Sequence, residues 1–234
     1  MRGERPDNGA ALTALALAAL ALCSGTMDVA SFLMLGNVFT SAMTGNTALL
    51  GFALSQGNLL SAAHSFSALI GFIVGAALAA IIGFRLQAQR PENLIRALLA
   101  IETLCLVAVG VMLTIVGPPG ESTAVFWLIL VSAVAMGIQG ITARYIHSPG
   151  INTIVFTSTL ISIVISLAEL LTRRSANGEL TADTKRQIGI FLAYGFGAVL
   201  AGLLIAAFLP IVGWIPVAAV LIALGCCEAA GRKS

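Results

Sequence analysis

The sequence predicts an all-α polytopic membrane protein. Three observations support this prediction: the composition, the recurring apolar runs and the short polar loops between them. Of the 234 residues, 59% are hydrophobic and only 9% are charged, whereas a soluble domain of this size needs far more charge to cover its surface. Apolar runs of roughly 20 residues, enough to cross a hydrocarbon core about 30 Å thick, recur along the chain. Short polar loops separate these runs, and most basic residues lie in these loops or at the two ends of the chain. We expect a single membrane domain over residues 1–234.

Composition also limits the partners. The net charge is +2 and the aromatic fraction is 6%, so no nucleic acid is expected. The lipid bilayer and a small-molecule or ion substrate are the expected partners, and no cofactor or metal is expected. The cysteines lie in apolar segments without CxxC spacing, which favours buried small hydrophobic residues over a disulfide or zinc framework. They are Cys23, Cys105, Cys226 and Cys227.

Eight apolar segments are predicted. The first follows two arginines, as a signal peptide would, but it lacks a suitable cleavage site and its apolar run continues, so it is interpreted as a retained membrane helix. The segments cover approximately residues 10–35, 38–54, 62–84, 94–116, 123–145, 151–171, 188–209 and 211–229.

The loop charges indicate which segments cross the membrane. Basic residues cluster before the first segment, after the third, after the sixth and at the C-terminus. If all eight segments crossed, the third and sixth loops would lie on opposite sides, against the positive-inside tendency. If segments 38–54 and 151–171 do not complete a crossing, every cluster lies in the cytoplasm. We therefore expect about six full transmembrane helices plus two short, broken or re-entrant segments, with both termini cytoplasmic.

This arrangement predicts two inverted repeats, at about 10–117 and 123–230, a common transporter architecture. The string "SGTMDVASF" aligns with "MGIQGITAR", and "VGAALA" aligns with "FGAVLA". A rival register pairs the two "VFTS" strings but leaves Thr44-Gly45-Asn46 opposite "ISI". In the preferred register, Thr40-x3-Thr44-Gly45-Asn46 aligns with Thr153-x3-Thr157-Ser158-Thr159.

The stretch "VFTSAMTGNTALLGF" is the first candidate site. Its β-branched and small residues are expected to run extended, after which Thr44 or Asn46 can cap a helix about half a membrane long. A helix that starts inside the membrane leaves backbone N–H groups free, which favours an anion. Close helix packing is the alternative reading of these small residues. The predicted substrate-binding residues are Thr40, Thr44, Gly45, Asn46, Thr153, Thr157, Ser158, Thr159 and Gln139.

Asp28 is the predicted ion-coupling residue. A carboxylate within a membrane segment costs roughly 2.5 to 3.5 kcal/mol on insertion scales and usually marks function, so Asp28 is a candidate H⁺ or Na⁺ site; the alternative is a helix cap near the far interface. For Gln139 the alternative to a site role is an interhelical hydrogen bond, and for Arg144 it is an interfacial anchor. Glu102 is either a second intramembrane carboxylate or an interfacial group, and both readings stay open.

The chain resembles the YoaK family of bacterial inner-membrane proteins, a family of unknown function. The matching letters are "GTMDVASFLMLGNVFTSAMTGNTALLGFA" in the first half and "MGIQGITARYIHSPGINTIVFTSTL" in the second. The resemblance implies a bacterial inner-membrane protein with six or seven crossings, and no established substrate. The sequence departs from the family pattern at Gln139-Gly140 and at Thr157-Ser158-Thr159, where the family favours Gln-Asn and Thr-Gly-Thr.

The leading hypothesis is a secondary transporter or permease of a small, anionic solute, coupled to H⁺ or Na⁺ through Asp28. A non-catalytic membrane scaffold or a passive channel is the alternative. A membrane enzyme is disfavoured because the sequence has no HExxH, no GxSxG and no Cys/His constellation. In a chain this short, a homodimer would allow two copies to enclose a pathway.

Overall fold

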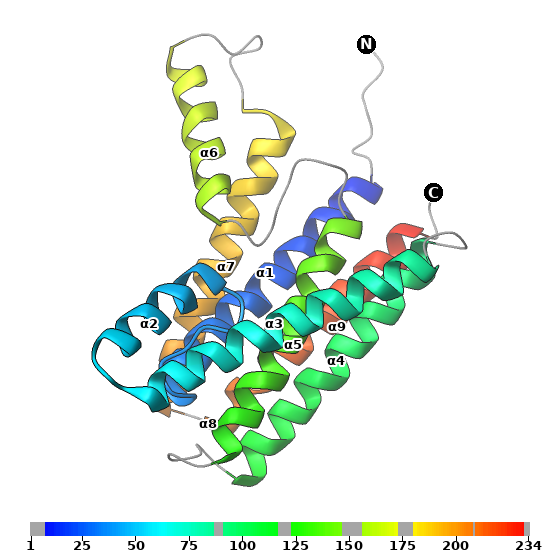
Figure 1. The fold of residues 1–234 in the computed structure, drawn as a ribbon. Coiled ribbons are helices and arrows are strands. Elements are labelled where there is room, and N and C mark those ends of the chain that lie inside the picture. Colours follow the sequence, from blue (N-terminus) through cyan, green and yellow to red (C-terminus); the bar gives the residue numbers. More distant parts are fainter. Residues whose placement is uncertain are drawn as a thin grey trace, which may run out of the picture.

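The computed structural model confirms the predicted all-helical membrane class (Figure 1). It describes residues 8–86, 91–116, 123–146, 156–172, 180–207 and 209–231, in which no strand occurs. The helices are α1 (Asn8–Met34), α2 (Met43–Ser55), α3 (Leu59–Leu86), α4 (Pro91–Val116), α5 (Thr123–Ile146), α6 (Phe156–Leu171), α7 (Ala182–Ala207), α8 (Leu209–Val212) and α9 (Ile215–Gly231).

Five helices of the described chain are long and apolar enough to cross a membrane: α1, α3, α4, α5 and α7. Each has an apolar stretch of 24 to 27 residues, which at 1.5 Å per residue exceeds a hydrocarbon core of about 30 Å. The two segments expected to be short are α2, with 13 residues, and α6, with 16. The last expected crossing is α9, whose 17 residues make it shorter than the other five.

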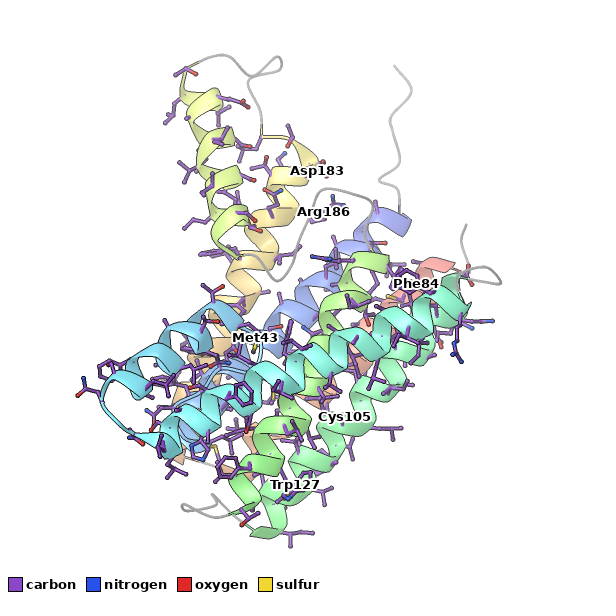
Figure 2. The ribbon with its side chains drawn as sticks, in the orientation of Figure 1. Met43, Phe84, Cys105, Trp127, Asp183 and Arg186 are labelled. Carbon is purple, nitrogen blue, oxygen red and sulfur yellow. The ribbon has the colours of Figure 1, made fainter. Side chains whose placement is uncertain are left out.

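The segment expected to run extended is non-helical and includes turns and bends. Residues 35–42 leave the helical conformation, and α2 begins only at Met43. Large apolar side chains cover the outside of the bundle, among them Phe84 at 80% exposure and Ile115 at 78%. Such a surface fits lipid rather than water. Figure 2 shows Phe84 and Trp127 toward opposite ends of the molecule.

Helices α1 and α7 pack backbone to backbone. A Cβ atom added to Gly25 would collide with the carbonyl oxygen of Tyr194, and one added to Gly197 would collide with that of Leu22. The hydroxyl of Thr26 reaches the Gly197 carbonyl oxygen at 3.3 Å. Only glycine permits this approach, as at other membrane helix contacts.

Helices α3 and α5 repeat the same contact. A Cβ atom on Gly137 would meet the carbonyl oxygen of Phe72, and one on Gly75 would meet that of Val134. The alignment that pairs Gly25 with Gly137 also pairs Leu22 with Val134. The alignment that pairs Gly75 with Gly197 likewise pairs Phe72 with Tyr194. In these predicted alignments, the positions that meet between α1 and α7 match the positions that meet between α5 and α3.

The directions of these helices are opposite. In Figure 1, α1 begins at the end of the bundle where α9 ends, whereas α5 begins at the other end. The main apolar core lies between α1, α4, α5, α7 and α9, and its fully buried members include Leu17, Leu20, Leu99, Val220 and Ala223. Helix α6 packs on α7 and, in Figure 1, projects from the bundle together with the first part of α7.

Candidate functional site

Helix α1 ends in a tight turn that sends the chain back into the bundle. Gly36 and Asn37 have φ values of 78° and 60°, a conformation in which glycine and asparagine are favoured. A Cβ atom on Gly36 would also strike the imidazole of His64. That ring is 5% exposed and packs on Phe126 with ring centroids 4.6 Å apart. The turn positions the non-helical segment 35–42.

Asp28 holds this segment from the side of α1. Its Oδ1 atom accepts the backbone N–H groups of Thr40 at 2.9 Å and Ser41 at 2.7 Å. Its Oδ2 atom accepts the Ser41 hydroxyl at 2.6 Å and the Tyr194 hydroxyl of α7 at 2.8 Å. Asp28 is 1% exposed. A carboxylate offers about four acceptor positions, so that these four donors saturate it. We call this arrangement the Asp28 clamp.

Asn46 holds the same segment from the side of α2. Its Oδ1 atom accepts the N–H of Phe39 at 2.9 Å, and its Nδ2 group donates to the Phe39 carbonyl oxygen at 2.6 Å. The Phe39 ring lies over Gly45, where a Cβ atom would come within 2.9 Å of it. The ring also stacks on Phe32 of α1. Asparagine and glycine at these two positions therefore fix the path of the backbone.

The start of α2 differs from the expected one. The N-cap is Ala42 and carries no side-chain cap, so the prediction that Thr44 or Asn46 caps the helix is wrong. The N–H groups of Met43 and Gly45 donate to the carbonyl oxygens of Ser41 and Ala42 at 3.0 Å each. Thr44 is exposed on the first turn. The turn is thus held by the backbone, and Thr44 is free to face the surroundings.

Gln139 links the two halves of the chain. Its Nε2 group donates to the Leu20 carbonyl oxygen at 2.9 Å and to the Ser24 hydroxyl at 2.6 Å, both on α1. This is the interhelical hydrogen bond that the sequence left as an alternative. Its Oε1 atom is buried without a hydrogen-bond partner in the described chain, and the same holds for the Oγ1 atom of Thr40. Both residues are buried in the bundle, with Thr40 at 0% exposure and Gln139 at 5%.

The second half is described less completely. Thr153 lies outside the described residues, and Thr157 lies in α6 with its side chain outside them. Ser158 is exposed, whereas Thr159 is 7% exposed. Helix α6 packs mainly on α7, whereas α2 packs on α3. A pocket formed jointly by the two short helices therefore stays a prediction.

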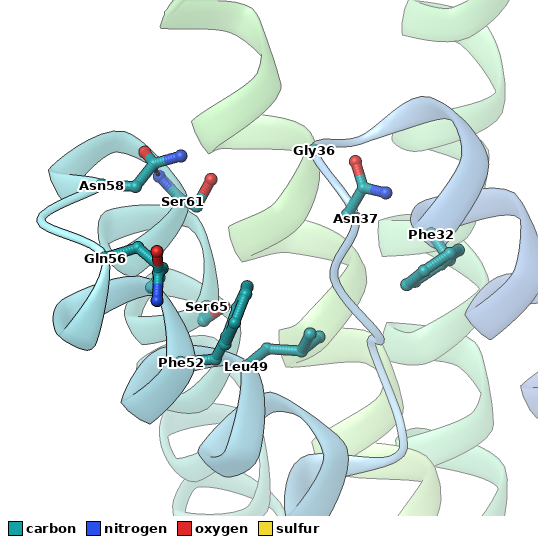
Figure 3. A pocket seen from close by; sticks show the side chains of 10 residues that line it. Phe32, Gly36, Asn37, Leu49, Phe52, Gln56, Asn58, Ser61 and Ser65 are labelled. Carbon is teal, nitrogen blue, oxygen red and sulfur yellow. Dashed lines mark hydrogen bonds between the residues drawn. The ribbon is translucent and has the colours of Figure 1, made fainter.

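A cavity of about 350 Å³ lies beside α2 (Figure 3). Leu49 and Phe52 of α2 form its apolar wall, and Asn37, Gln56 and Asn58 supply amide groups at its rim. The volume lies in the range of about 300 to 1,000 Å³ that is common for small-molecule sites. None of its lining residues is charged. It borders the turn after α1 and the later part of α2, away from Thr44.

The structure decides between the alternatives for two charged residues. Arg144 is exposed in the last turn of α5, as an interfacial anchor would be. Glu102 is 0% exposed near the middle of α4, so it is an intramembrane carboxyl group and not an interfacial one.

Sequence reasoning missed Tyr194 as part of the site. It lies in the middle of α7 and is 166 positions from Asp28, so local spacing gives no hint of the contact. One signal was available, since a tyrosine hydroxyl within an apolar helix needs a hydrogen-bond partner. Ser41 was also missed, although it lies inside the polar stretch that was singled out.

The long apolar helices, the lipid-type surface and the buried polar clamp define a multi-pass helical membrane protein. The family of proteins of unknown function called DUF1275 matches residues 16–226, and the chain belongs to this family. It is also similar to the UPF0700 transmembrane protein YoaK of Bacillus subtilis (strain 168). The two are 28% identical over 201 residues, which cover 86% of this chain and 88% of that protein. No solved structure matches the chain.

Proposed function

We propose that the protein is a secondary transporter of a small, anionic solute. The observation that carries this proposal is a non-helical segment inside a membrane bundle, held by the Asp28 clamp and followed by the half-length helix α2. Irregular backbone at membrane depth is tolerated only where protein buries it or it faces a cavity. Broken helices of this kind form the solute sites of many secondary transporters.

Two inverted repeats, at about 10–117 and 123–230, would supply the alternating access that such a transporter needs. The equivalent glycine contacts of α1 with α7 and of α5 with α3 support this arrangement, because a two-fold relation of the halves requires them to match. The opposite directions of α1 and α5 support it as well (Figure 1). Rocking of one helix pair against the other would then expose the solute site to each side in turn.

The solute would bind around the start of α2. Thr44 is exposed there, and the unpartnered Thr40 hydroxyl and the first-turn dipole of α2 favour an acceptor-rich group such as a carboxylate. The remaining predicted residues, Gly45, Asn46 and Gln139, would shape the site through their backbone and amide contacts. In the second half, Thr153, Thr157, Ser158 and Thr159 would complete it.

We propose a bacterial inner membrane with both termini in the cytoplasm. Helix ends that carry Arg85, Arg96 and Arg144 lie at the end of the bundle where α1 begins (Figure 1). Figure 2 places Arg186 toward this end too. Gathering basic residues at one end follows the positive-inside tendency.

A non-catalytic scaffold or a passive channel is the second candidate. Neither would need the alternating access of a transporter. An enzyme stays the least favoured candidate on the sequence, which has no HExxH, no GxSxG and no Cys/His constellation. Two copies would still be able to form a homodimer through the apolar outer faces.

The test is solute uptake by the purified full-length protein in lipid vesicles. A panel of small carboxylates and matched neutral solutes is offered with and without a pH or Na⁺ gradient. A transporter gives saturable uptake of a carboxylate, and Thr44→Ala lowers it. A flux that does not saturate would identify a channel, and no flux for any solute would favour the scaffold.

A further inference from the structure

Glu102 differs from every other carboxyl group of the described chain in its surroundings. It is fully buried, and neither of its carboxyl oxygens has a hydrogen-bond partner among the described residues. It lies close to the midpoint of α4 (Pro91–Val116), and Figure 2 shows Cys105, one turn further along, about halfway down that helix. The group is thus deep in the bundle and unpaired.

The surroundings of Glu102 are apolar. Leu98, Leu99 and Leu106 on the same face of α4 are at most 1% exposed, and Leu99 and Leu106 belong to the main core. The carboxyl group is within electrostatic reach of the Cys23 and Cys105 thiols. No hydrogen bond joins Glu102 to any titratable or charged group on α4 or the helices around it, namely Cys23, Asp28, His64, Arg85, Glu92, Arg96, Cys105, Arg144, Tyr145, Cys226, Cys227 and Glu228.

This environment suits a proton and does not suit a metal ion. A cation such as Na⁺ or Ca²⁺ needs several oxygen ligands. The residues named above around Glu102 are leucines and cysteines, which have no side-chain oxygen. An ionised carboxylate without a partner is strongly disfavoured in an apolar interior. A proton satisfies the group without any further ligand. The arginine nearest along α4, Arg96, instead faces Glu228 of α9 at 3.7 Å.

We propose that Glu102 is the reversible proton-binding group of this protein. In the conformation described, one carboxyl oxygen carries the proton. When the bundle opens to water, the O–H bond breaks and the proton passes to a water molecule, and rebinding from the other side reverses the step. The proposal rests on the proposed transport function for its purpose, and it assigns coupling to Glu102 instead of Asp28. The oxygens of Asp28 are already occupied by four donors.

The test is infrared difference spectroscopy of the full-length protein in vesicles of phosphatidylethanolamine and phosphatidylglycerol. Spectra at about pH 5 and about pH 9 span the usual carboxyl and histidine ranges. We expect a carboxylic-acid C=O stretch that loses intensity at the higher pH in the wild type. Glu102→Gln, a neutral isostere of the protonated acid, removes the band. Asp28→Asn retains it, and Cys105→Ser serves as a control on the same helix.

Two results would overturn the assignment: a band that Glu102→Gln leaves unchanged, or a Glu102-dependent band that keeps the same intensity at both pH values. Circular dichroism and size-exclusion chromatography establish that each variant is folded. A failure of the transport proposal can be distinguished from a failure of the proton-site proposal. If no solute is taken up but the Glu102 band titrates, the proton site stands and the transporter does not. If uptake is observed and Glu102→Gln keeps its pH dependence, the transporter stands and the proton site does not.

Discussion

The helix pairs α1–α7 and α3–α5 make similar glycine contacts and differ in their polar chemistry. The contact of Gly25 and Gly197 between α1 and α7 recurs as that of Gly137 and Gly75 between α5 and α3. In the same alignment, however, Gly140 stands opposite Asp28. The second half therefore lacks the carboxylate of the clamp.

The α3–α5 pair also lacks the hydroxyl partner of the clamp, because Phe72 of α3 stands opposite Tyr194 of α7. The comparison teaches that small residues make the backbone contacts of both helix pairs, whereas only the α1–α7 pair carries the carboxylate of Asp28 and the hydroxyl of Tyr194 that donates to it. Two helix pairs can differ in this way because close backbone contacts tolerate few substitutions, whereas all members of a polar cluster can be replaced together.

Removing the clamp is expected to have the largest effect. Asp28→Ala leaves the N–H groups of Thr40 and Ser41 buried without partners, at a cost of about 1 to 3 kcal/mol for each. Amide hydrogen exchange at residues 39–46 is expected to accelerate strongly, and the free energy of unfolding is expected to fall. Thr44→Ala is the matched control, because Thr44 is exposed in the same stretch. Unchanged exchange in Asp28→Ala would show that the clamp does not hold the segment.

Substitutions at the glycine contacts test whether the α1–α7 and α3–α5 pairs pack in the same way. Gly25→Ala and Gly137→Ala both push a Cβ atom into a backbone carbonyl group, of Tyr194 and Phe72 respectively. Each is expected to destabilise the protein by about 1 to 3 kcal/mol, the usual cost of overpacking, and by similar amounts. Thermal unfolding in detergent measures both. Gly195→Ala is the control, since nothing lies within 4 Å of its added Cβ, and unequal effects would argue against equivalent packing.

Tyr194→Phe gives α7 the residue that α3 carries at the aligned position, Phe72. It removes the hydroxyl that donates to Asp28 at 2.8 Å, for which a loss of about 1.5 kcal/mol is expected, as for hydrogen bonds to charged groups. A double-mutant cycle with Asp28→Asn measures the coupling between the two side chains. Strictly additive effects would contradict a direct bond between them.

The smallest effect on stability is expected at the start of α2. Thr44→Ala should change the free energy of unfolding by less than about 0.5 kcal/mol, because surface substitutions seldom do more. Solute uptake by the same variant should fall, since the proposed site includes this hydroxyl. Normal uptake by a stable Thr44→Ala protein would remove Thr44 from the site.

Much of the fold follows from the sequence alone. Hydropathy predicts the long helices, and the loop charges predict that the segments holding α2 and α6 are short. The alignment of Gly25 with Gly137 and of Gly75 with Gly197 anticipates the equivalent contacts, because glycine at a helix interface has few substitutes.

The candidate site was less accessible to sequence reasoning. The clamp joins Asp28 to Tyr194, and no local pattern encodes a contact over such a separation. The N-cap at Ala42 also escapes prediction, because backbone carbonyl groups replace the expected side-chain cap. The burial of Glu102 depends on which face of α4 meets the core, and a uniformly apolar helix does not reveal that face.

If the protein is a transporter, the start of α2 is exposed alternately to the two sides of the membrane. The most direct measurement is labelling of Thr44→Cys in vesicles by a membrane-impermeant maleimide added outside or trapped inside, with the four native cysteines replaced by serine. A transporter predicts labelling from both sides, with a change of pH raising one rate and lowering the other. Labelling from one side under every condition would contradict the claim, as would labelling from both sides at rates that pH leaves unchanged.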